Sequence, residues 1–423
     1  MKRFLCFALV LIMAFVLPAC GKEEAPQTSA PEETPVWEGK FSVGYGRVDV
    51  TPNYSVGMGG YGDIRMSIGV LSKLYFTCIA VTDETGNTVL LCTYDAKSVN
   101  PENTKKMREA AAEATGVPYD NIMISSTHSH STPEQVEPFL SFVNECVAKA
   151  AKAAMDDRSP ATMEHASKEI ENMTFVRHYM TTTGIVIGDN FTPQGAGSRV
   201  SHTTEADKEM RVIRVNREGK KPIIMVNWQG HPTIASSAWT EFGKLHRDYL
   251  TSDYVGTCRD YVEGKLECDF AMYIGASGNL NVTGALRGEQ QDTTVFKYGE
   301  ELGDHVLSTL ENMTPLSTSN ITVAKTQFDG QRATYDIFAV GMGSLGVIVD
   351  PNEMFDTTAM DIRARSPYEV TFVLQQANGT YGYMPTAECY DYIECYEVSN
   401  KFVKGDAERM ADMFVELLNQ TKE

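Results

Sequence analysis

The sequence has few basic residues for its acidic content, and this shortage excludes a nucleic-acid-binding function. Its 423 residues include 37 lysines and arginines against 56 aspartates and glutamates, a net charge of −19. Nucleic-acid-binding proteins need a basic face to neutralise phosphates, so we expect no nucleic-acid partner. With 42% hydrophobic and 22% charged residues, the composition is that of a globular protein.

Long hydrophobic runs are also scarce, and the clearest one stands at the N-terminus. It extends from Phe4 to Leu17, follows two basic residues, and is too short to span a bilayer comfortably. The run ends in "LPAC", which is typical of a bacterial lipoprotein signal. We therefore expect cleavage before Cys20, lipid attachment to its sulfur, and an exported protein that is anchored to the cell membrane and faces outside the cytoplasm. An ordinary signal peptide is the alternative.

Three segments describe the organisation that the sequence predicts. Residues 1–20 form the predicted lipoprotein signal peptide. Residues 21–36 are polar and proline-rich, with nothing that could pack, and are predicted to be a disordered tether. Residues 37–423 show no break in composition and are predicted to be one catalytic domain.

Cysteines are few, and their spacing does not match a structural zinc site. The chain has nine, and none shows the two-by-two spacing of such a site. Three pairs lie close in the sequence: Cys78 and Cys92, Cys258 and Cys268, and Cys389 and Cys395. The first pair flanks a predicted turn and would face each other across a hairpin. Disulfides and buried free thiols both remain open for these pairs.

Strands and helices alternate after the tether, without an internal repeat. Residues 75–95 predict two strands joined by a turn at Gly86. Residues 100–118 predict a helix with Asn100 as its N-cap, and a second helix is predicted from about Glu134 to Met155. Several apolar strands look buried on both faces. The pattern predicts an α/β fold with a mixed, largely parallel sheet flanked by helices.

Histidine is rare, with eight residues in the chain, yet two of them stand together in "NIMISSTHSHSTPE". Polar side chains follow four of the apolar strands at their ends: His128 and His130, His231, Glu353, and Tyr383. In open α/β sheets, ligands bind at the carboxyl ends of the strands. If these side chains converge, two imidazoles and a carboxylate with one open position form a catalytic zinc site. The alternative is a set of separate structural residues.

The two neighbouring histidines are predicted to differ in role. Residues two apart on an extended chain point the same way, so His128 and His130 would lie side by side. Several ligands from one short loop would be crowded. We therefore interpret His128 as a metal ligand and His130 as a proton carrier.

These segments resemble the catalytic domain of the neutral/alkaline, non-lysosomal ceramidases, which are zinc-dependent amidases. The resemblance covers the chain from about Phe41 to Leu418. Its markers follow in order: "VGYGRVDVTP" with "GMGGYG", "GVPYDNIMISSTHSHSTP", "VNWQGHPT", "IGASGNLN", "DPNEMF" and "ANGTYGYMPTAECYDYIECYE". The resemblance implies a Zn²⁺ cofactor and an N-acyl lipid substrate, met at a membrane surface.

Carried over residue by residue, the resemblance implies a role for each matching position. The implied metal ligands are His128, His231, Glu353 and Tyr383. His130 would hydrogen-bond the developing oxyanion or pass a proton. Tyr396 and Arg177 match a further active-site tyrosine and the site arginine of the family.

One position departs from the family pattern. The segment that corresponds to "GASGNLN" ends in a serine in the ceramidases, and here that position is Asn281. Ser277 lies nearby but does not align with it. Asparagine cannot form an acyl-enzyme by the hydroxyl route, whereas attack by a metal-activated water needs no serine. We therefore still expect a metal mechanism. Specificity for ceramide is a weaker expectation.

The sequence as a whole predicts a zinc-dependent hydrolase at the cell surface. It would cleave a linear amide, either an N-acyl lipid such as ceramide or a related smaller amide, by metal-activated water. The alternatives are an esterase on the same metal site, a non-catalytic metal-containing binding lipoprotein, and a metal-free surface adhesin.

Overall fold

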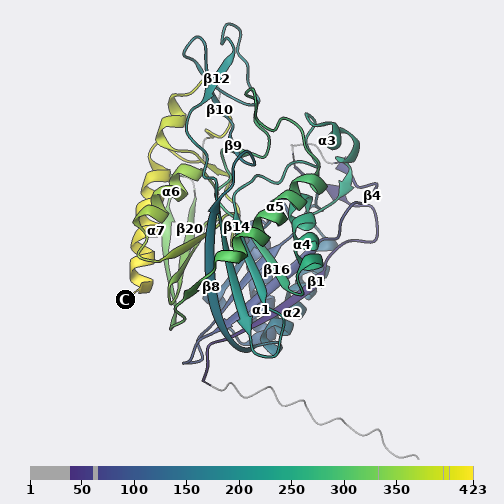
Figure 1. The fold of residues 1–423 in the computed structure, drawn as a ribbon, viewed down its shortest axis with the longest axis vertical. Coiled ribbons are helices and arrows are strands. Elements are labelled where there is room, and N and C mark those ends of the chain that lie inside the picture. Colours follow the sequence, from purple (N-terminus) through teal and green to yellow (C-terminus); the bar gives the residue numbers. More distant parts are fainter. Residues whose placement is uncertain (1–38, 61–64, 332, 394, 400, 423) are drawn as a thin grey trace, which may run out of the picture. The chain divides into compact units, whose positions relative to one another are not determined.

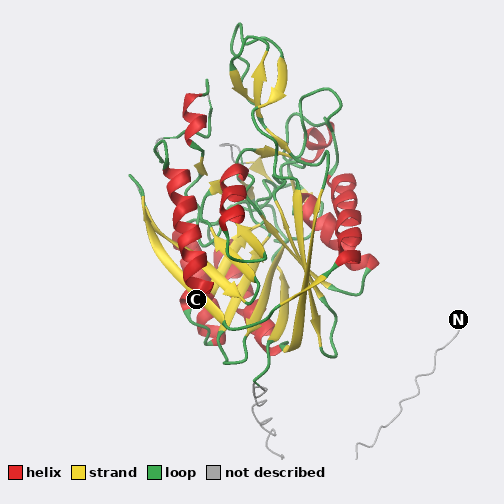
Figure 2. Ribbon diagram, turned by 60° about the vertical axis from the view of Figure 1, so that its left-hand side comes forward, coloured by secondary structure: helices red, strands yellow, loops and turns green. Residues whose placement is uncertain are grey.

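Two β-sheets stacked face to face, with helices on their outer surfaces, form the framework of the protein (Figure 1, Figure 2). The computed structural model describes residues 39–60, 65–331, 333–393, 395–399 and 401–422. The predicted signal peptide with Cys20 and the predicted tether therefore lie outside the described residues. In the described part of the chain, no helix has both the length and the apolar composition needed to cross a bilayer.

The larger sheet has nine strands. They are β1 (Ser42–Asp49), β5 (Tyr75–Thr82), β6 (Thr88–Tyr94), β7 (Ile122–Ser126), β8 (Ser159–Glu169), β13 (Glu209–Arg217), β14 (Ile223–Trp228), β16 (Asp269–Ile274) and β18 (Thr314–Leu316). Their order is β16-β14-β13-β8-β1-β5-β6-β7, with β18 paired to β8. The sheet is mixed, as predicted. It is not largely parallel, because only β6–β7 and β14–β16 run parallel among its described pairs.

Short turns produce two of the antiparallel pairs, β5–β6 and β13–β14. Strands β5 and β6 are joined through Asp83–Asn87, and the backbone N–H of Asp83 donates to the carbonyl of Asn87 at 2.9 Å. A connection this short can only reverse the chain, whereas parallel neighbours need a long crossover. Gly86 has φ of +94° in this turn, a conformation that glycine adopts without strain. The predicted hairpin is therefore confirmed.

A second sheet covers one face of the first, so the expectation of a single sheet was wrong. It contains β19 (Ile321–Asp329), β20 (Thr334–Met342), β21 (Leu345–Val349) and β23 (Val370–Leu374), in that order. Strands β21 and β23 are parallel. One apolar cluster joins the sheets, with Val43 and Ile79 from the larger one and Phe338, Val347 and Phe372 from the smaller one. The strands are apolar on both faces because one face meets the other sheet and the opposite face meets helices.

Helices cover the outer faces of both sheets (Figure 2). They are α1 (Pro101–Thr115), α2 (Phe139–Asp156), α3 (Glu241–His246), α4 (Asp253–Lys265), α5 (Val295–Thr309), α6 (Asp356–Arg365) and α7 (Asp406–Lys422). Helices α1 and α2 pack on β5 and β6, while α4 and α5 pack on β14 and β16. Helices α6 and α7 cover the smaller sheet. The arrangement is a four-layer α/β/β/α sandwich.

Local signals explain where these helices begin and end. The side chain of Asn100 accepts a hydrogen bond from the backbone N–H of Asn103 at 2.8 Å, as predicted, and Gly116 ends α1 in the left-handed conformation. Helix α2 begins later than expected, at Phe139. Pro138 immediately precedes it and has no N–H to donate, so it cannot stand inside the helix.

Short strands and turns surround the ends of the main strands. They are β2 (Gly57–Met58), β3 (Arg65–Met66), β4 (Gly69–Val70), β9 (Phe175–Val176), β10 (His178–Thr181), β11 (Val186–Gly188), β12 (Arg199–His202), β15 (Tyr249–Leu250), β17 (Leu280–Asn281), β22 (Glu353–Met354) and β24 (Tyr383–Met384), with 3₁₀ turns at Tyr119–Asn121, Leu310–Asn312 and Ala387–Asp391. Of these, β9, β17, β22 and β24 carry residues of the candidate site or their direct neighbours.

The cysteine pairs differ in state. Cys389 and Cys395 form a disulfide. Cys78 and Cys92 stand directly opposite each other in the hairpin, as predicted, but both are free and buried. The third close pair is free as well. The disulfide therefore lies in the loop that leads to Tyr396.

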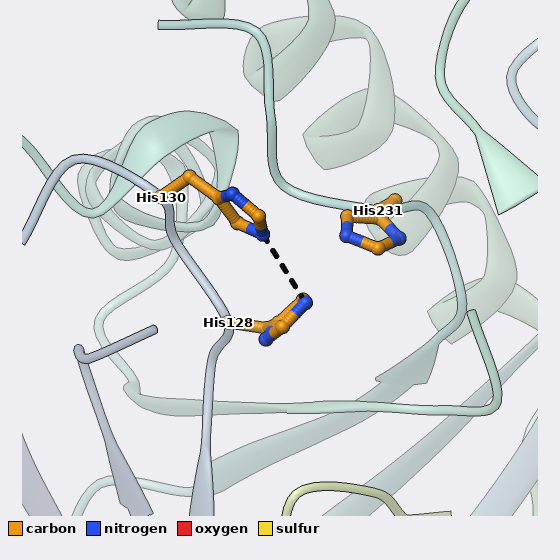
Figure 3. Close-up of side chains that lie close together, drawn as sticks. All are labelled: His128, His130 and His231. Atoms are coloured by element: carbon orange, nitrogen blue, oxygen red, sulfur yellow. Dashed lines mark hydrogen bonds between the residues drawn. The ribbon is translucent and has the colours of Figure 1, made fainter. Parts of the chain in front are cut away.

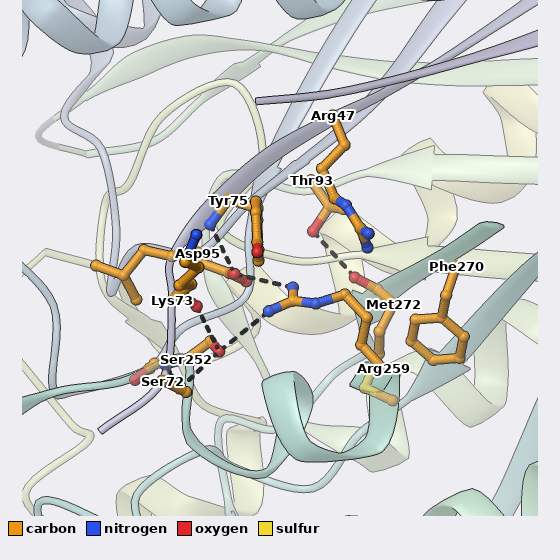
Figure 4. A network of polar contacts seen from close by, with 12 residues as sticks. Arg47, Ser72, Lys73, Tyr75, Thr93, Asp95, Ser252, Arg259, Phe270 and Met272 are labelled. Carbon is orange, nitrogen blue, oxygen red and sulfur yellow. Dashed lines mark hydrogen bonds and ion pairs between the residues drawn. The ribbon is translucent and has the colours of Figure 1, made fainter. Parts of the chain in front are cut away.

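A buried ion pair ties α4 to the end of β6 (Figure 4). Nη1 of Arg259 lies 2.9 Å from Oδ2 of Asp95, and both side chains are almost fully buried. The same carboxylate oxygen accepts from the backbone N–H of Tyr75 at 2.9 Å, and Arg259 also donates to Ser252 Oγ at 3.3 Å. Asp95 opens the loop that leads to Lys97, so this pair anchors a segment next to the histidines.

Removal of the arginine is expected to destabilise the protein, because it leaves the carboxylate of Asp95 buried without a counter-charge. We expect Arg259→Leu to lower the free energy of unfolding by about 3–5 kcal/mol, measured by urea denaturation. Arg365→Leu is the control, since Arg365 pairs with Asp412 at the surface and its loss should cost about 1 kcal/mol or less. Equal losses of unfolding free energy in the two variants would contradict a stabilising role for the buried Arg259–Asp95 pair.

Candidate active site

Three histidine rings meet beyond the ends of two strands of the larger sheet (Figure 3). His128 and His130 follow β7, and His231 follows β14. The ring centroid of His128 lies 4.8 Å from that of His130 and 4.7 Å from that of His231, and the third distance is 5.4 Å. All three rings are buried, and one nitrogen of each lies within 4.8 Å of the others. The structure thus brings together the histidines that the sequence singled out.

Backbone carbonyls orient two of these rings. Nδ1 of His128 lies 2.7 Å from the carbonyl oxygen of Lys97, and Nδ1 of His231 lies 2.9 Å from that of Ser277. A carbonyl oxygen can only accept, so each Nδ1 carries the proton and each Nε2 presents a lone pair. Burial, with smaller contributions from His128 and Arg177, lowers the pKa of His231 to about 3, so this ring is neutral at physiological pH. A carbonyl on the second ring nitrogen is the usual arrangement of a metal-binding histidine.

Glu353 adds a carboxylate at the same point. Its Oε2 lies 3.3 Å from Nε2 of His128, and no described residue donates a hydrogen bond to it. Burial alone would raise the pKa of Glu353, but His128, His231 and Arg177 together lower it to about 2, so the group is ionised. A carboxylate oxygen and an imidazole lone pair repel each other at this distance unless a cation lies between them. The donor set therefore fits a divalent metal ion.

Two tyrosines and an arginine complete the group. Tyr383 in β24 pairs in register with Glu353 in β22, and its ring centroid lies 5.6 Å from that of Tyr396. The guanidinium carbon of Arg177 lies 5.3 Å from the Tyr383 ring and 4.9 Å from the Tyr396 ring. Burial raises the pKa of both phenols, so they stay protonated and can donate hydrogen bonds at neutral pH.

The pKa of His130 is shifted in the opposite sense. Burial, then the neighbouring His128 and His231 and the positive charges of Lys97 and Arg177, lower the pKa of His130 well below its usual value. The ring is therefore neutral and able to accept a proton. Its Nε2 lies 3.3 Å from Nε2 of His128 (Figure 3).

These side chains open into one cavity of about 680 Å³. Its wall includes most of the predicted site: His130, Arg177, His231, Glu353, Tyr383 and Tyr396. His128 is fully buried behind this wall. A cavity of this size accommodates a small molecule or one end of a larger one.

Backbone geometry, not strand alternation, places His128. Its φ of +64° is the left-handed conformation, which is uncommon outside glycine and costs of order 1 kcal/mol or more. The prediction that His128 and His130 lie side by side is met, but by this bend and not by an extended chain. Gly278 allows another close approach, because a Cβ there would stand 2.5 Å from the carbonyl oxygen of Glu353.

The position of the family serine has a different role here. Nδ2 of Asn281 donates to Oδ2 of Asp189 at 2.8 Å, and both residues line the cavity. Ser277 is fully buried and outside the cavity wall, where its carbonyl orients His231 and its hydroxyl accepts from Gln375. Neither residue offers a hydroxyl nucleophile to the cavity.

Sequence reasoning missed Glu397. Its side chain is fully buried, with Oε1 2.9 Å from Nε of Arg177 and Oε2 3.3 Å from Nε2 of His178. An acid directly after the motif residue Tyr396 was the available signal. The orienting carbonyls of Lys97 and Ser277 were missed as well, because a backbone carbonyl is common to every residue type.

Comparison with known proteins places this geometry in a family. The family model described as neutral/alkaline non-lysosomal ceramidase, N-terminal, matches residues 41–264. The solved structure titled "Ceramidase complexed with C2" has a TM-score of 0.71 at 13% identity, over 90% of this chain and 75% of that one. The neutral ceramidase from Pseudomonas aeruginosa has a TM-score of 0.70 at 14% identity, with the same coverage. At these identities the structures show a shared fold. No curated protein matches this chain in sequence.

Replacement of Glu397 by glutamine is expected to slow any reaction at this site, because the charge that holds Arg177 in place is lost. We expect Glu397→Gln to lower kcat about tenfold or more, a loss of about 1.4 kcal/mol of transition-state stabilisation, with unchanged metal content. Steady-state kinetics and elemental analysis measure the two effects. Glu388→Gln, an exposed change in the same loop, should have no effect. Loss of metal in Glu397→Gln would contradict the interpretation that Glu397 acts by holding Arg177 in place.

Proposed function

The chain belongs to the neutral/alkaline non-lysosomal ceramidase family, and on that premise we propose that it is a zinc-dependent hydrolase of linear amides. The substrate would be an N-acyl lipid such as ceramide, or a smaller amide with the same bond. One observation carries the proposal: the lone pair of His128 meets the buried carboxylate of Glu353 next to the ring of His231, beside a substrate-sized cavity.

The side chains present suit zinc. His128, His231 and Glu353 would hold the ion, with Tyr383 as a fourth protein ligand. When bound, zinc lowers the pKa of a water molecule from about 15.7 to about 7 and so supplies hydroxide at neutral pH. The carbonyls of Lys97 and Ser277 keep the two imidazoles in the tautomer that this binding needs.

His130 would carry the proton. Its neutral ring accepts the proton of the attacking water as the water oxygen bonds to the carbonyl carbon. The carbon–nitrogen bond then breaks, His130 returns the proton to the leaving nitrogen, and the products are a carboxylic acid and an amine. Such proton transfer by a positioned side chain contributes about 10²–10⁴-fold to the rate.

Tyr396 and Arg177 would stabilise the negative charge on the carbonyl oxygen. The phenol is protonated, and the guanidinium is held near both tyrosine rings by Glu397. One well-placed donor of this kind is worth about 2.7–4 kcal/mol in the transition state. No serine nucleophile is required, in agreement with the cavity wall around Asn281.

Activity assays of the zinc-loaded protein test the proposal. We expect release of amine from N-acyl substrates, loss of activity with a chelator and its return with zinc. His128→Ala and His231→Ala should lose zinc and activity together. His130→Ala should keep zinc, measured by elemental analysis, while its kcat falls about 10²-fold or more.

Other outcomes would replace the proposal. Cleavage of a matched ester without the amide would assign an esterase, and stoichiometric zinc without any turnover would assign a binding protein. Loss of zinc in His130→Ala would mean that His128 and His130 have been assigned in reverse.

The location at a membrane surface is also a proposal, supported by the sequence of residues 1–20. A lipid on Cys20 would hold the enzyme beside lipid substrates. In the bacterial host we expect the full chain in the membrane fraction and the variant Cys20→Ala outside it, measured by fractionation and immunoblot. Mass spectrometry of the mature N-terminus should find an acylated cysteine, and an unmodified cysteine would contradict the anchor.

A further inference from the structure

The charges that line the active-site cavity differ from those of the chain as a whole. The protein carries a net charge of −19. The cavity wall holds three cationic side chains and two carboxylates: Lys97, Arg177, Arg199, Asp189 and Glu353. The proposed metal ion would add further positive charge. With the ion bound, an acidic protein would thus have an electropositive cavity, which raises the local concentration of anionic ligands.

Two of the three cations already have carboxylate partners. Arg177 pairs with Glu397 at 2.9 Å, and Arg199 pairs with Asp189 at 3.5 Å. Within the described part of the chain, no carboxylate lies within ion-pairing distance of the ammonium group of Lys97. Lys97 therefore supplies the cavity with a cation that is available to a ligand.

Hydrogen bonds fix the backbone of Lys97 beside the reactive groups. Its carbonyl accepts from Nδ1 of His128 at 2.7 Å, and its backbone N–H donates to Oγ1 of Thr132 at 2.9 Å. The side chain lines the same cavity as His130. Because these two hydrogen bonds fix the backbone of Lys97, its side chain starts from a defined point next to His128.

We propose that the substrate carries a carboxylate close to the scissile amide and that Lys97 binds this group. The inference rests on the proposed amide hydrolysis and narrows its substrate to N-acyl amino acids. In these compounds the carboxylate is attached to the carbon that bears the amide nitrogen. With the amide at the histidines, the carboxylate lies within reach of a lysine anchored on the same loop. A neutral N-acyl amine would leave the ammonium without a partner in a cavity from which the ligand excludes water.

A matched pair of substrates tests this assignment in the zinc-loaded protein. N-lauroylglycine and N-lauroylethanolamine share the acyl chain and the amide, and differ by a carboxylate in place of a hydroxymethyl group. We expect kcat/KM to favour the glycine conjugate by about tenfold or more, because only this conjugate offers the ammonium group a charge-assisted hydrogen bond. Lys97→Met should reduce this ratio about tenfold, and Lys97→Arg should largely retain it. Lys152→Met, an exposed charge change on α2, is the control and should leave the ratio unchanged.

A binding measurement gives a second readout that does not depend on turnover. Calorimetric titration of the metal-free protein with N-lauroylglycine should show binding that weakens about tenfold in Lys97→Met. The same titration with N-lauroylethanolamine should show little difference between the two proteins.

The outcomes separate this inference from the proposed function. Equal rates for both conjugates, or an unchanged ratio in Lys97→Met, would overturn the carboxylate assignment while amide hydrolysis stands. A stronger preference for N-lauroylphosphoethanolamine would also overturn it, in favour of a phosphate. If no amide is cleaved, the proposed function fails, and the titration still decides whether Lys97 binds a carboxylate.

Discussion

The hydrogen bonds from two imidazole Nδ1 atoms to backbone carbonyls are the constraint on which the rest of the site depends. They place the protons of His128 and His231 on Nδ1, so that both Nε2 atoms keep their lone pairs, and Nε2 of His128 lies 3.3 Å from the carboxylate of Glu353. Without them, either ring could turn or change tautomer, and the donor set would no longer suit a cation. Because backbone carbonyls hold the rings, the geometry depends on the path of the chain and not on further side chains.

The fold supplies that path through a small number of parallel strand pairs. Most pairs of the larger sheet are antiparallel, but β6–β7 and β14–β16 run parallel, as do β21–β23 and the short pair β22–β24. The segments that follow these strands carry the site residues. Carboxyl ends of parallel neighbours lie at one edge, which explains why a largely antiparallel sandwich still presents its chemistry there. The pairs Asp95–Arg259 and Glu397–Arg177 then hold the loops that extend beyond that edge.

The cavity wall combines charged side chains with amide side chains. Asn281 holds Asp189, Arg199 pairs with the same carboxylate, and Lys97 adds a charge without a carboxylate partner among the described residues. A wall of this kind offers hydrogen bonds and charge, and it is costly to cover with an alkyl chain alone. In the proposed function, the reaction type would depend on the histidines and Glu353, and the substrate preference on the residues around them.

The sequence by itself determined the local elements and the polar residues that gather at the candidate site. The hairpin around Gly86, the capped helix α1 and the polar residues after apolar strands could all be predicted, because turn chemistry, capping and periodicity act over a few neighbouring positions. The tertiary structure alone decided that two sheets stack and that His128 adopts a left-handed conformation. It also decided that Lys97, Ser277 and Glu397 act on the site. Those features arise from contacts between segments far apart in the chain, such as Arg177 and Glu397 at a separation of 220 residues, and a carbonyl oxygen or a buried partner leaves no mark on the residue type.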